Sequence, residues 1–466
     1  MNRLFRKLTP KRGMLYIVGH GHHRIPSAAE PPKGFLGKHY HWIVAAVLFL
    51  SYLIYCGLGN NLYSFFVVPV TTDLQVSRGA YTLGSTFAGI SGFFSGLFYI
   101  EVYRRVGHRI PAFIAFLVYA GACVAYSFAK GVVTFYIFGL ISGCFGSFVT
   151  TIGISQIINN WFHKYHGTVL GVIFASSGIG GALFAQIHEG IMEASSWRTA
   201  LLVQAGALVF AALLVVIFIR NRPERMGLHP LGYEEDVHPD EKHHKRAITE
   251  WRGEPFKGGV AKKPAFWLLV LAFFLCTLSC STLFNIVPSH IRDQGMSSET
   301  ASQVHSIMLL ALAGGKILVG FFCDRFPAHK VVFFLMLSNI AAALLLATVA
   351  TPGMAILAVI VYAPGLSFST MMPSLLATDL FGTNSYARAV GILVSTISLA
   401  AMMLTPLANF LYDKIGSFTP LIYGIAASGV LVTILFVIIG ILGERDKKKF
   451  LAEQQDLRED LVDELE

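Results

Sequence analysis

Charged side chains are scarce in this sequence. Asp, Glu, Lys and Arg make up 14% of its 466 residues, whereas an average soluble domain carries about 25%. Hydrophobic residues reach 54%, the mean hydropathy is +0.61, and the charges gather in short clusters between long apolar runs. This distribution excludes an ordinary soluble domain and indicates a chain that crosses a lipid bilayer many times.

Several other features are missing as well. The six cysteines all lie in apolar segments without the spacing of a zinc site, so we expect neither a metal site nor a disulfide framework. No apolar run follows Met1 within the first forty residues, which argues against a cleavable signal peptide. The net charge of +9 arises from basic loops, which is typical of membrane topology, and we expect no nucleic-acid partner.

About twelve apolar segments have the ~20 residues that a helix needs to cross a bilayer. They are predicted at 42–70, 81–102, 110–128, 132–161, 168–191, 199–219, 265–288, 299–323, 331–350, 354–380, 389–412 and 421–442. Lys and Arg are concentrated in the N-terminal arm, in the short loop of Arg104, Arg105 and Arg109, and in the long central loop. The positive-inside rule therefore places both termini and the central loop in the cytoplasm of a multi-pass plasma-membrane protein.

The two sets of six segments look like repeats of each other. The step FFVVP ends at Pro69 and FNIVP ends at Pro288, 219 residues later. Two further pairs of motifs repeat at nearly the same interval: RRVGHR with RFPAHK after 221 residues, and WFHKYHGTVLG with LFGTNSYARAVG after 220. We therefore predict an all-α membrane protein of twelve transmembrane helices in two six-helix, pseudo-symmetric halves. The predicted division is an arm at 1–41, a half at 42–219, a loop at 220–263, a half at 264–443 and a charged cytoplasmic tail at 444–466.

Over residues 42–442 the sequence resembles the major facilitator superfamily, through GKILVGFFCDRF at 315–326. The resemblance implies that Asp324 and Arg325 lock neighbouring helices at the cytoplasmic face. Arg104 and Arg105 belong to the first-half copy of this motif, where Tyr103 stands at the place of the expected Asp. That departure puts a latch on the N-terminal side in doubt.

A narrower resemblance is carried by NNWFHKYHGTVLGVIFASSGIGGALFAQ at 159–186 and SWRTAL at 196–201. These stretches are similar to the monocarboxylate transporter and oxalate–formate antiporter branch, with His166 in place of the usual Arg. The small residues of ASSGIGG are most simply explained by close helix packing.

Lys316 is the most conspicuous residue within the apolar segments. It lies roughly 25 Å along a helix from Glu299 and roughly 12 Å from Asp324, which places it within the bilayer. One interpretation is a cation that binds an anionic substrate, and another is a lysine paired with backbone carbonyls or a helix C-terminus. The resemblance implies the first, because related carriers use a basic residue here, usually Arg, to contact substrate carboxylate. Lysine lacks the bidentate fork of Arg and can lose its proton.

A second cation is missing from the segment at 389–412, which contains no Lys, Arg or His, whereas the similar oxalate carriers have one there. Because one cation neutralises one carboxylate, we favour a monoanion. Asp and Glu are also absent from the depth of every span. His305 is therefore the proton-coupling candidate, since it lies on the same face as Lys316, eleven residues away. An interfacial histidine bonded to a neighbour is an equally open interpretation.

Other candidate substrate-binding residues are polar or aromatic. Tyr55 and Asn60 in the first segment would be unsatisfied against lipid, so they line a cavity or bond another helix. Phe145 is a further candidate in the fourth segment. The tenth carries Tyr362 and Phe368, and the resemblance implies that aromatics near Phe368 cap the substrate. Pro364 and Pro373 predict a bend there.

The expected function is secondary transport of a small organic anion, most simply a monocarboxylate coupled to protons, by alternating access. Anion exchange, a larger amphipathic acid and a transporter-like sensor remain alternatives. A GxxxxGK[ST] loop is missing, which leaves ATP drive unsupported. GxSxG, HExxH and paired deep carboxylates are missing too, so we expect neither catalysis nor a cofactor.

Overall fold

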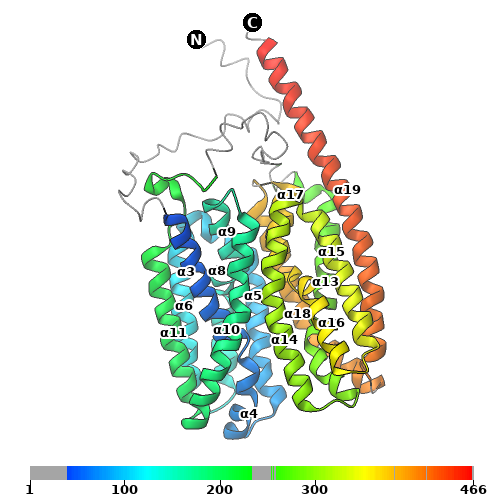
Figure 1. Ribbon diagram of the computed structural model, residues 1–466. Helices are drawn as coiled ribbons and strands as arrows, with labels where there is room; N and C mark the ends of the chain where they lie inside the picture. The colour runs from blue at the N-terminus through cyan, green and yellow to red at the C-terminus, as the bar shows by residue number, and fades with distance from the viewer. Residues whose placement is uncertain are drawn as a thin grey trace.

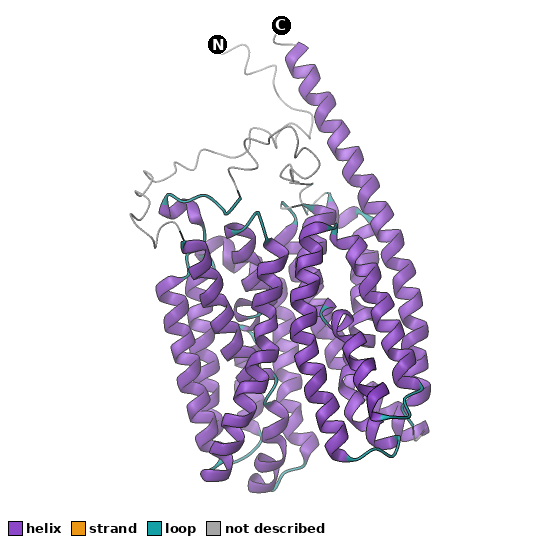
Figure 2. Ribbon diagram, viewed as in Figure 1, coloured by secondary structure: helices purple, strands orange, loops and turns teal. Residues whose placement is uncertain are grey.

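The computed structural model describes residues 39–232, 253, 256, 259–382, 384–415 and 417–463. In this part of the chain, helices are the only regular secondary structure apart from one bridge between Phe162 and Leu231 (Figure 2). Most of the predicted N-terminal arm and much of the central loop lie outside the described residues.

Two groups of helices stand side by side (Figure 1). The first comprises α3 (Tyr40–Tyr55), the π-helix η1 (Cys56–Asn60), α4 (Tyr63–Leu74), α5 (Arg78–Val106), α6 (Arg109–Ser127), α7 (Val133–Gly143), α8 (Gly146–Val149), α9 (Thr151–Trp161), α10 (His166–Ala194) and α11 (Trp197–Phe218). The second comprises α13 (Pro264–Asp293), α14 (Ser298–Arg325), α15 (Ala328–Ala347), α16 (Pro352–Leu366), α17 (Phe368–Phe381), α18 (Tyr386–Ile415) and α19 (Thr419–Asp463). Short 3-10 turns, Pro223–Met226 and Val260–Lys262, flank the central segment.

The predicted repeat appears as matching helix starts. Helices α5 and α14 begin 220 residues apart, at 78 and 298, and α10 and α18 begin 220 apart, at 166 and 386. Broken helices complete the sets of six: α3, η1 and α4 form the first segment, α7 to α9 the fourth, and α16 with α17 the tenth. The prediction of twelve segments in two pseudo-symmetric halves is confirmed.

The helices carry the surface expected of a membrane protein. In the described part of the chain, nine unbroken or nearly unbroken helices are each long and apolar enough to cross a bilayer. Large apolar side chains face outward from the bundle, with Phe98 63% and Phe334 68% exposed. In water so many exposed apolar side chains would be unfavourable, whereas hydrocarbon solvates them.

Two of the helix interruptions differ in kind. The tenth segment breaks at Ser367, between α16 and α17 and three residues after Pro364, which confirms the predicted bend. The first segment widens into a π-turn, in which the Asn61 N–H bonds the Cys56 carbonyl at 3.2 Å. Turns of this kind often occur at functional sites.

A Cβ on Gly57 would lie 2.7 Å from the Gly180 backbone, so the ASSGIGG stretch of α10 does serve close helix packing.

The halves meet along two pairs of helices, α10 with α14 and α5 with α18. Ser395 of α18 donates to the Phe93 carbonyl of α5 at 2.9 Å. Along the other pair, a Cβ on Gly171 would lie 2.6 Å from the Lys316 carbonyl and 3.2 Å from the Ile317 Cα. Glycine at position 171 therefore allows the backbones of α10 and α14 to touch.

Helix α3 begins and helix α19 ends at the same end of the bundle, which we call the terminal face (Figure 1). Helix α19 does not stop with the bundle but continues beyond this face to Asp463. Helix α4 lies near the opposite end. Helices α10 and α18 begin at the terminal face, and α5 and α14 end there, so the pairs that join the halves run antiparallel.

The contact at Gly171 gives a first prediction. Gly171→Ala should lower the free energy of unfolding by about 1–3 kcal/mol, because the new Cβ meets backbone atoms that cannot rotate away. Thermal denaturation of the purified protein in detergent measures the effect.

Gly190→Ala is the matched control on the same helix, since a Cβ there meets nothing within 4 Å and alanine favours helix. It should leave the midpoint unchanged or raise it. Equal midpoints for the two variants would contradict the proposed backbone contact.

Candidate functional site between the two halves

Lys316 lies on α14 at the contact between the halves. Its side chain is only 3% exposed, and its ammonium donates across the contact to α10. The acceptors are the Phe174 carbonyl at 3.1 Å and the Ser177 hydroxyl at 2.8 Å. The C-terminal half therefore supplies the cation and the N-terminal half supplies both of its acceptors.

The groups around Lys316 are linked to one another. The Ser177 hydroxyl donates to the Phe174 carbonyl at 2.8 Å, and the Asn61 amide donates to the Ser177 carbonyl at 2.7 Å. The Cys56 thiol of η1 lies within electrostatic range of the ammonium. One turn of α10 and the widened first segment thus form the N-terminal side of the site.

The charge of Lys316 is not neutralised within the described part of the chain, where no carboxylate lies at ion-pair distance from its ammonium. An ammonium has three N–H donors, and two of them are used here on neutral acceptors. A buried charge that lacks a counter-ion is unfavourable. The arrangement is therefore suited to accept an anion, which would supply both the missing charge and a third acceptor.

Asp324 joins the halves two turns nearer the terminal face. Its carboxylate accepts the Gly167 N–H at 2.6 Å, the Thr168 N–H at 2.8 Å and the Thr168 hydroxyl at 2.5 Å. Tyr165, which precedes α10, has a φ of +61° and provides no side-chain cap. The N-terminus of α10 is thus capped by a residue of the other half, and the negative charge also suits the helix dipole.

The other residues of the motif do not take part in this cap. The Arg325 guanidinium lies over the Phe321 ring of its own helix, 3.6 Å from the centroid. In the first half, Arg105 pairs with Glu101 at 2.7 Å on the exposed surface of α5, and Arg104 is exposed. Tyr103, at the place of the expected Asp, accepts a bond from Asn160 at 2.9 Å within its own half.

The remaining predicted residues are spread over both halves. His305 lies on α14 against the Phe284 ring of α13, with centroids 5.6 Å apart, and its Nδ1 is buried without a partner in the described structure. Tyr55 donates to the Tyr119 hydroxyl at 3.0 Å inside the N-terminal half. Asn60 ends η1, but its side chain is outside the described part of the structure. None of these contacts joins the halves.

Two of the predicted aromatics, Tyr362 and Phe368, pack inside the C-terminal half. Tyr362 is fully buried and donates to the Cys280 carbonyl of α13. Phe368 packs against Phe273, with tilted rings and centroids 4.6 Å apart, and meets Phe436 edge to face at 5.4 Å. Phe145 packs partly buried against the main core. The structure does not bring these three side chains together with Lys316, and their role in substrate binding stays a prediction.

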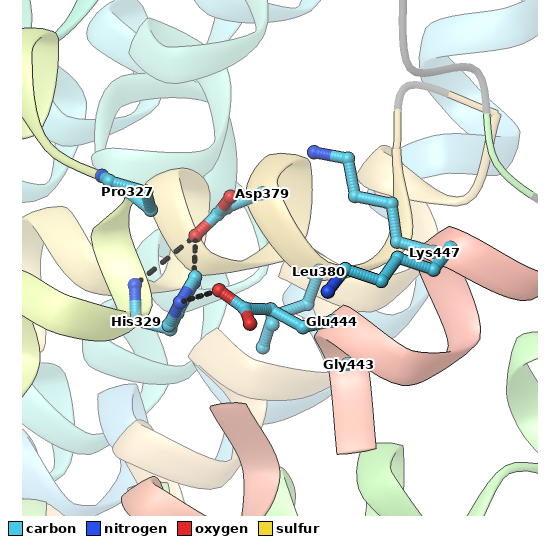
Figure 3. A pocket seen from close by; sticks show the side chains of 8 residues that line it. Pro327, His329, Asp379, Leu380, Gly443, Glu444 and Lys447 are labelled. Carbon is cyan, nitrogen blue, oxygen red and sulfur yellow. Dashed lines mark hydrogen bonds and ion pairs between the residues drawn. The ribbon is translucent and has the colours of Figure 1, made fainter. Parts of the chain in front are cut away.

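A second ionic cluster at the terminal face was missed by sequence reasoning. His329 lies between two carboxylates: its Nδ1 is 2.8 Å from Asp379 and its Nε2 is 3.0 Å from Glu444 (Figure 3). These contacts join α15, α17 and α19 beside an open pocket of about 350 Å³. In the sequence, His329 stands out only as part of RFPAHK, the second-half counterpart of RRVGHR.

The fold is that of a multi-pass membrane protein with two six-helix halves, which in this chain meet around the buried Lys316. A sequence profile described as the Major Facilitator Superfamily matches residues 48–378. The chain belongs to this superfamily, in its monocarboxylate-transporter-like branch.

Among its relatives, human monocarboxylate transporter 7 is 24% identical over 392 residues, covering 72% of this chain and 74% of that one. Monocarboxylate transporter 12 of Xenopus laevis is 23% identical over 283 residues, covering 56% of this chain and 59% of its own length. A solved structure of the proton:xylose symporter XylE superposes with a TM-score of 0.67 at 15% identity, over 85% of this chain and 95% of that chain. This likeness shows the shared fold.

The cap on α10 gives a second prediction. Asp324→Asn removes the negative charge and one acceptor, so closure of the terminal face should weaken by about 1–2 kcal/mol, or roughly 5- to 30-fold in the open-to-closed ratio. Spin labels on cysteines at the exposed positions Arg104 and Lys330, one on each half, report the distance distribution.

The control is Glu101→Gln, which breaks an exposed pair within one helix and should leave the distribution unchanged. If Asp324→Asn also leaves it unchanged, the cap does not hold the terminal face closed.

Proposed function

We propose that this protein is a secondary transporter that moves a small organic anion, most favourably a monocarboxylate, across the plasma membrane. The observation that carries the proposal is the Lys316 ammonium, buried between the halves without a counter-ion in the described structure. Binding one carboxylate there would neutralise one charge and fill the free N–H position. The relatives named monocarboxylate transporters support the same substrate class.

Alternating access is the mechanism that this arrangement suits. A site between two halves is exposed to one side or the other when the halves rock about it. Lys316 contacts α10 directly, and Asp324 of the same helix caps the start of α10. Movement of α14 away from α10 would therefore break both contacts together and open the terminal face.

Coupling to protons is part of the proposal. His305 lies on the same helix as Lys316 and has a buried ring nitrogen without a partner in the described structure. A proton taken up there, on Lys316 or on the substrate itself would offset the charge of the anion during crossing. We assign the terminal face to the cytoplasm, because the described helix termini and turns at that end carry Arg104, Arg105, Arg109, Lys262 and Lys330.

Uptake of radiolabelled acids into proteoliposomes tests the proposal. Wild-type uptake of short monocarboxylates should rise with an inward proton gradient and exceed uptake of dicarboxylates. Lys316→Gln should reduce uptake by about 10- to 100-fold, the range expected for the loss of a charged hydrogen bond. Lys316→Arg keeps the charge and should retain part of the activity.

Lys330→Gln removes an exposed lysine at the terminal face and should transport at the wild-type rate. Wild-type transport by a folded Lys316→Gln protein would overturn the proposal. Binding without flux in the wild type would instead identify a sensor, and uptake driven only by an opposite anion gradient would identify an exchanger.

A further inference from the structure

Ser177 occupies the position directly across the contact from Lys316. Its side chain is 8% exposed, its oxygen accepts from the ammonium, and its single hydrogen is donated to the Phe174 carbonyl. A hydroxyl has one donor and two acceptor positions and can rotate. The hydrogen of Ser177 can therefore turn toward a new acceptor without any backbone movement.

The backbone of Ser177 is held in place by the first segment. Asn61, which follows η1, donates to the Ser177 carbonyl, and a Cβ on Gly181 would meet the Asn61 side chain at 2.5 Å. Gly178 faces the other half, where a Cβ would lie 3.0 Å from the Leu309 carbonyl. The backbone at Ser177 is thus fixed between the end of η1 and α14, while the hydroxyl remains free to rotate.

A carboxylate is a stronger acceptor for an ammonium than the neutral groups that Lys316 now contacts. An anion that reaches Lys316 therefore displaces its contacts with α10. The displaced hydroxyl is then free to donate to one carboxylate oxygen while Lys316 binds the other. Tyr52 lies against Phe174, with ring centroids 5.2 Å apart, and provides an aromatic surface nearby.

We propose that Ser177 is a second anion-binding residue, which holds Lys316 across the halves in the empty carrier and donates to the substrate carboxylate in the loaded one. This inference rests on the proposed function. It assigns the site a ligand with one carboxylate, bound by a cation from one half and a hydroxyl from the other. An uncharged substrate cannot displace Ser177 in this way.

Initial rates of monocarboxylate uptake over a range of concentrations test the inference. Ser177→Ala should raise KM about tenfold, as expected for loss of a hydrogen bond to a charged group, with kcat within about twofold. Ser177→Thr keeps the hydroxyl, so its KM should lie within about threefold of the wild-type value. Ser177→Cys keeps the shape but bonds weakly, so it should resemble Ser177→Ala and provides the readout if the alanine variant is unstable.

Ser176→Ala is the matched control. Ser176 is fully buried on the adjacent position and donates to the Ile173 carbonyl at 2.6 Å, within its own helix, so its removal should leave KM unchanged. A purely structural Ser177 would lower the amount of active carrier without changing KM, and that result would overturn the inference.

The two proposals fail in different ways. If Lys316→Gln loses uptake while Ser177→Ala and Ser177→Cys keep the wild-type KM, the role of Ser177 is refuted and the proposed function stands. If Lys316→Gln transports normally, the proposed function fails and this inference fails with it.

Discussion

One buried positive charge explains much of the arrangement between the halves. Within the described part of the chain, Lys316 is held in a low-dielectric region by one hydroxyl and one carbonyl. Such a charge is tolerated only when its hydrogen-bonding groups are well placed. That requirement fixes the distance between α10 and α14, which Gly171 makes possible. It also leaves a favourable position for one negative charge, so in the proposed mechanism the same residue both joins the halves and attracts the ligand.

Helix α10 connects the site to the terminal face. Its first N–H groups are capped by Asp324, and Ser177, about three turns further along, holds Lys316. Both partners lie on α14, eight residues apart, and therefore move together. In the proposed mechanism an anion that takes Lys316 from Ser177 weakens one end of this contact, and separation of Asp324 from α10 completes the opening. The first half lacks an equivalent carboxylate at Tyr103, so the two halves are not mechanically equivalent.

Much of the fold could be predicted from the sequence, because a bilayer restricts the chain to helices of nearly fixed length. The repeat interval, the bend after Pro364 and the position of Lys316 follow from local patterns. Ser177 could not be found in this way, because its role depends on the pairing of helices 139 residues apart and its own neighbourhood resembles ordinary close packing. Tyr362 and Phe368 remain predictions of residue type. Packing within one half buries them beside Cys280 and Phe273, and that packing could not be predicted from the sequence.

The most direct test of the central claim is a structure of the full-length protein determined with a short monocarboxylate bound. The account predicts a carboxylate oxygen at hydrogen-bond distance from the Lys316 ammonium, about 2.7–2.9 Å, with the contact between Lys316 and Ser177 broken. A bound acid located elsewhere, with Lys316 still on the Phe174 carbonyl and the Ser177 hydroxyl, would contradict it.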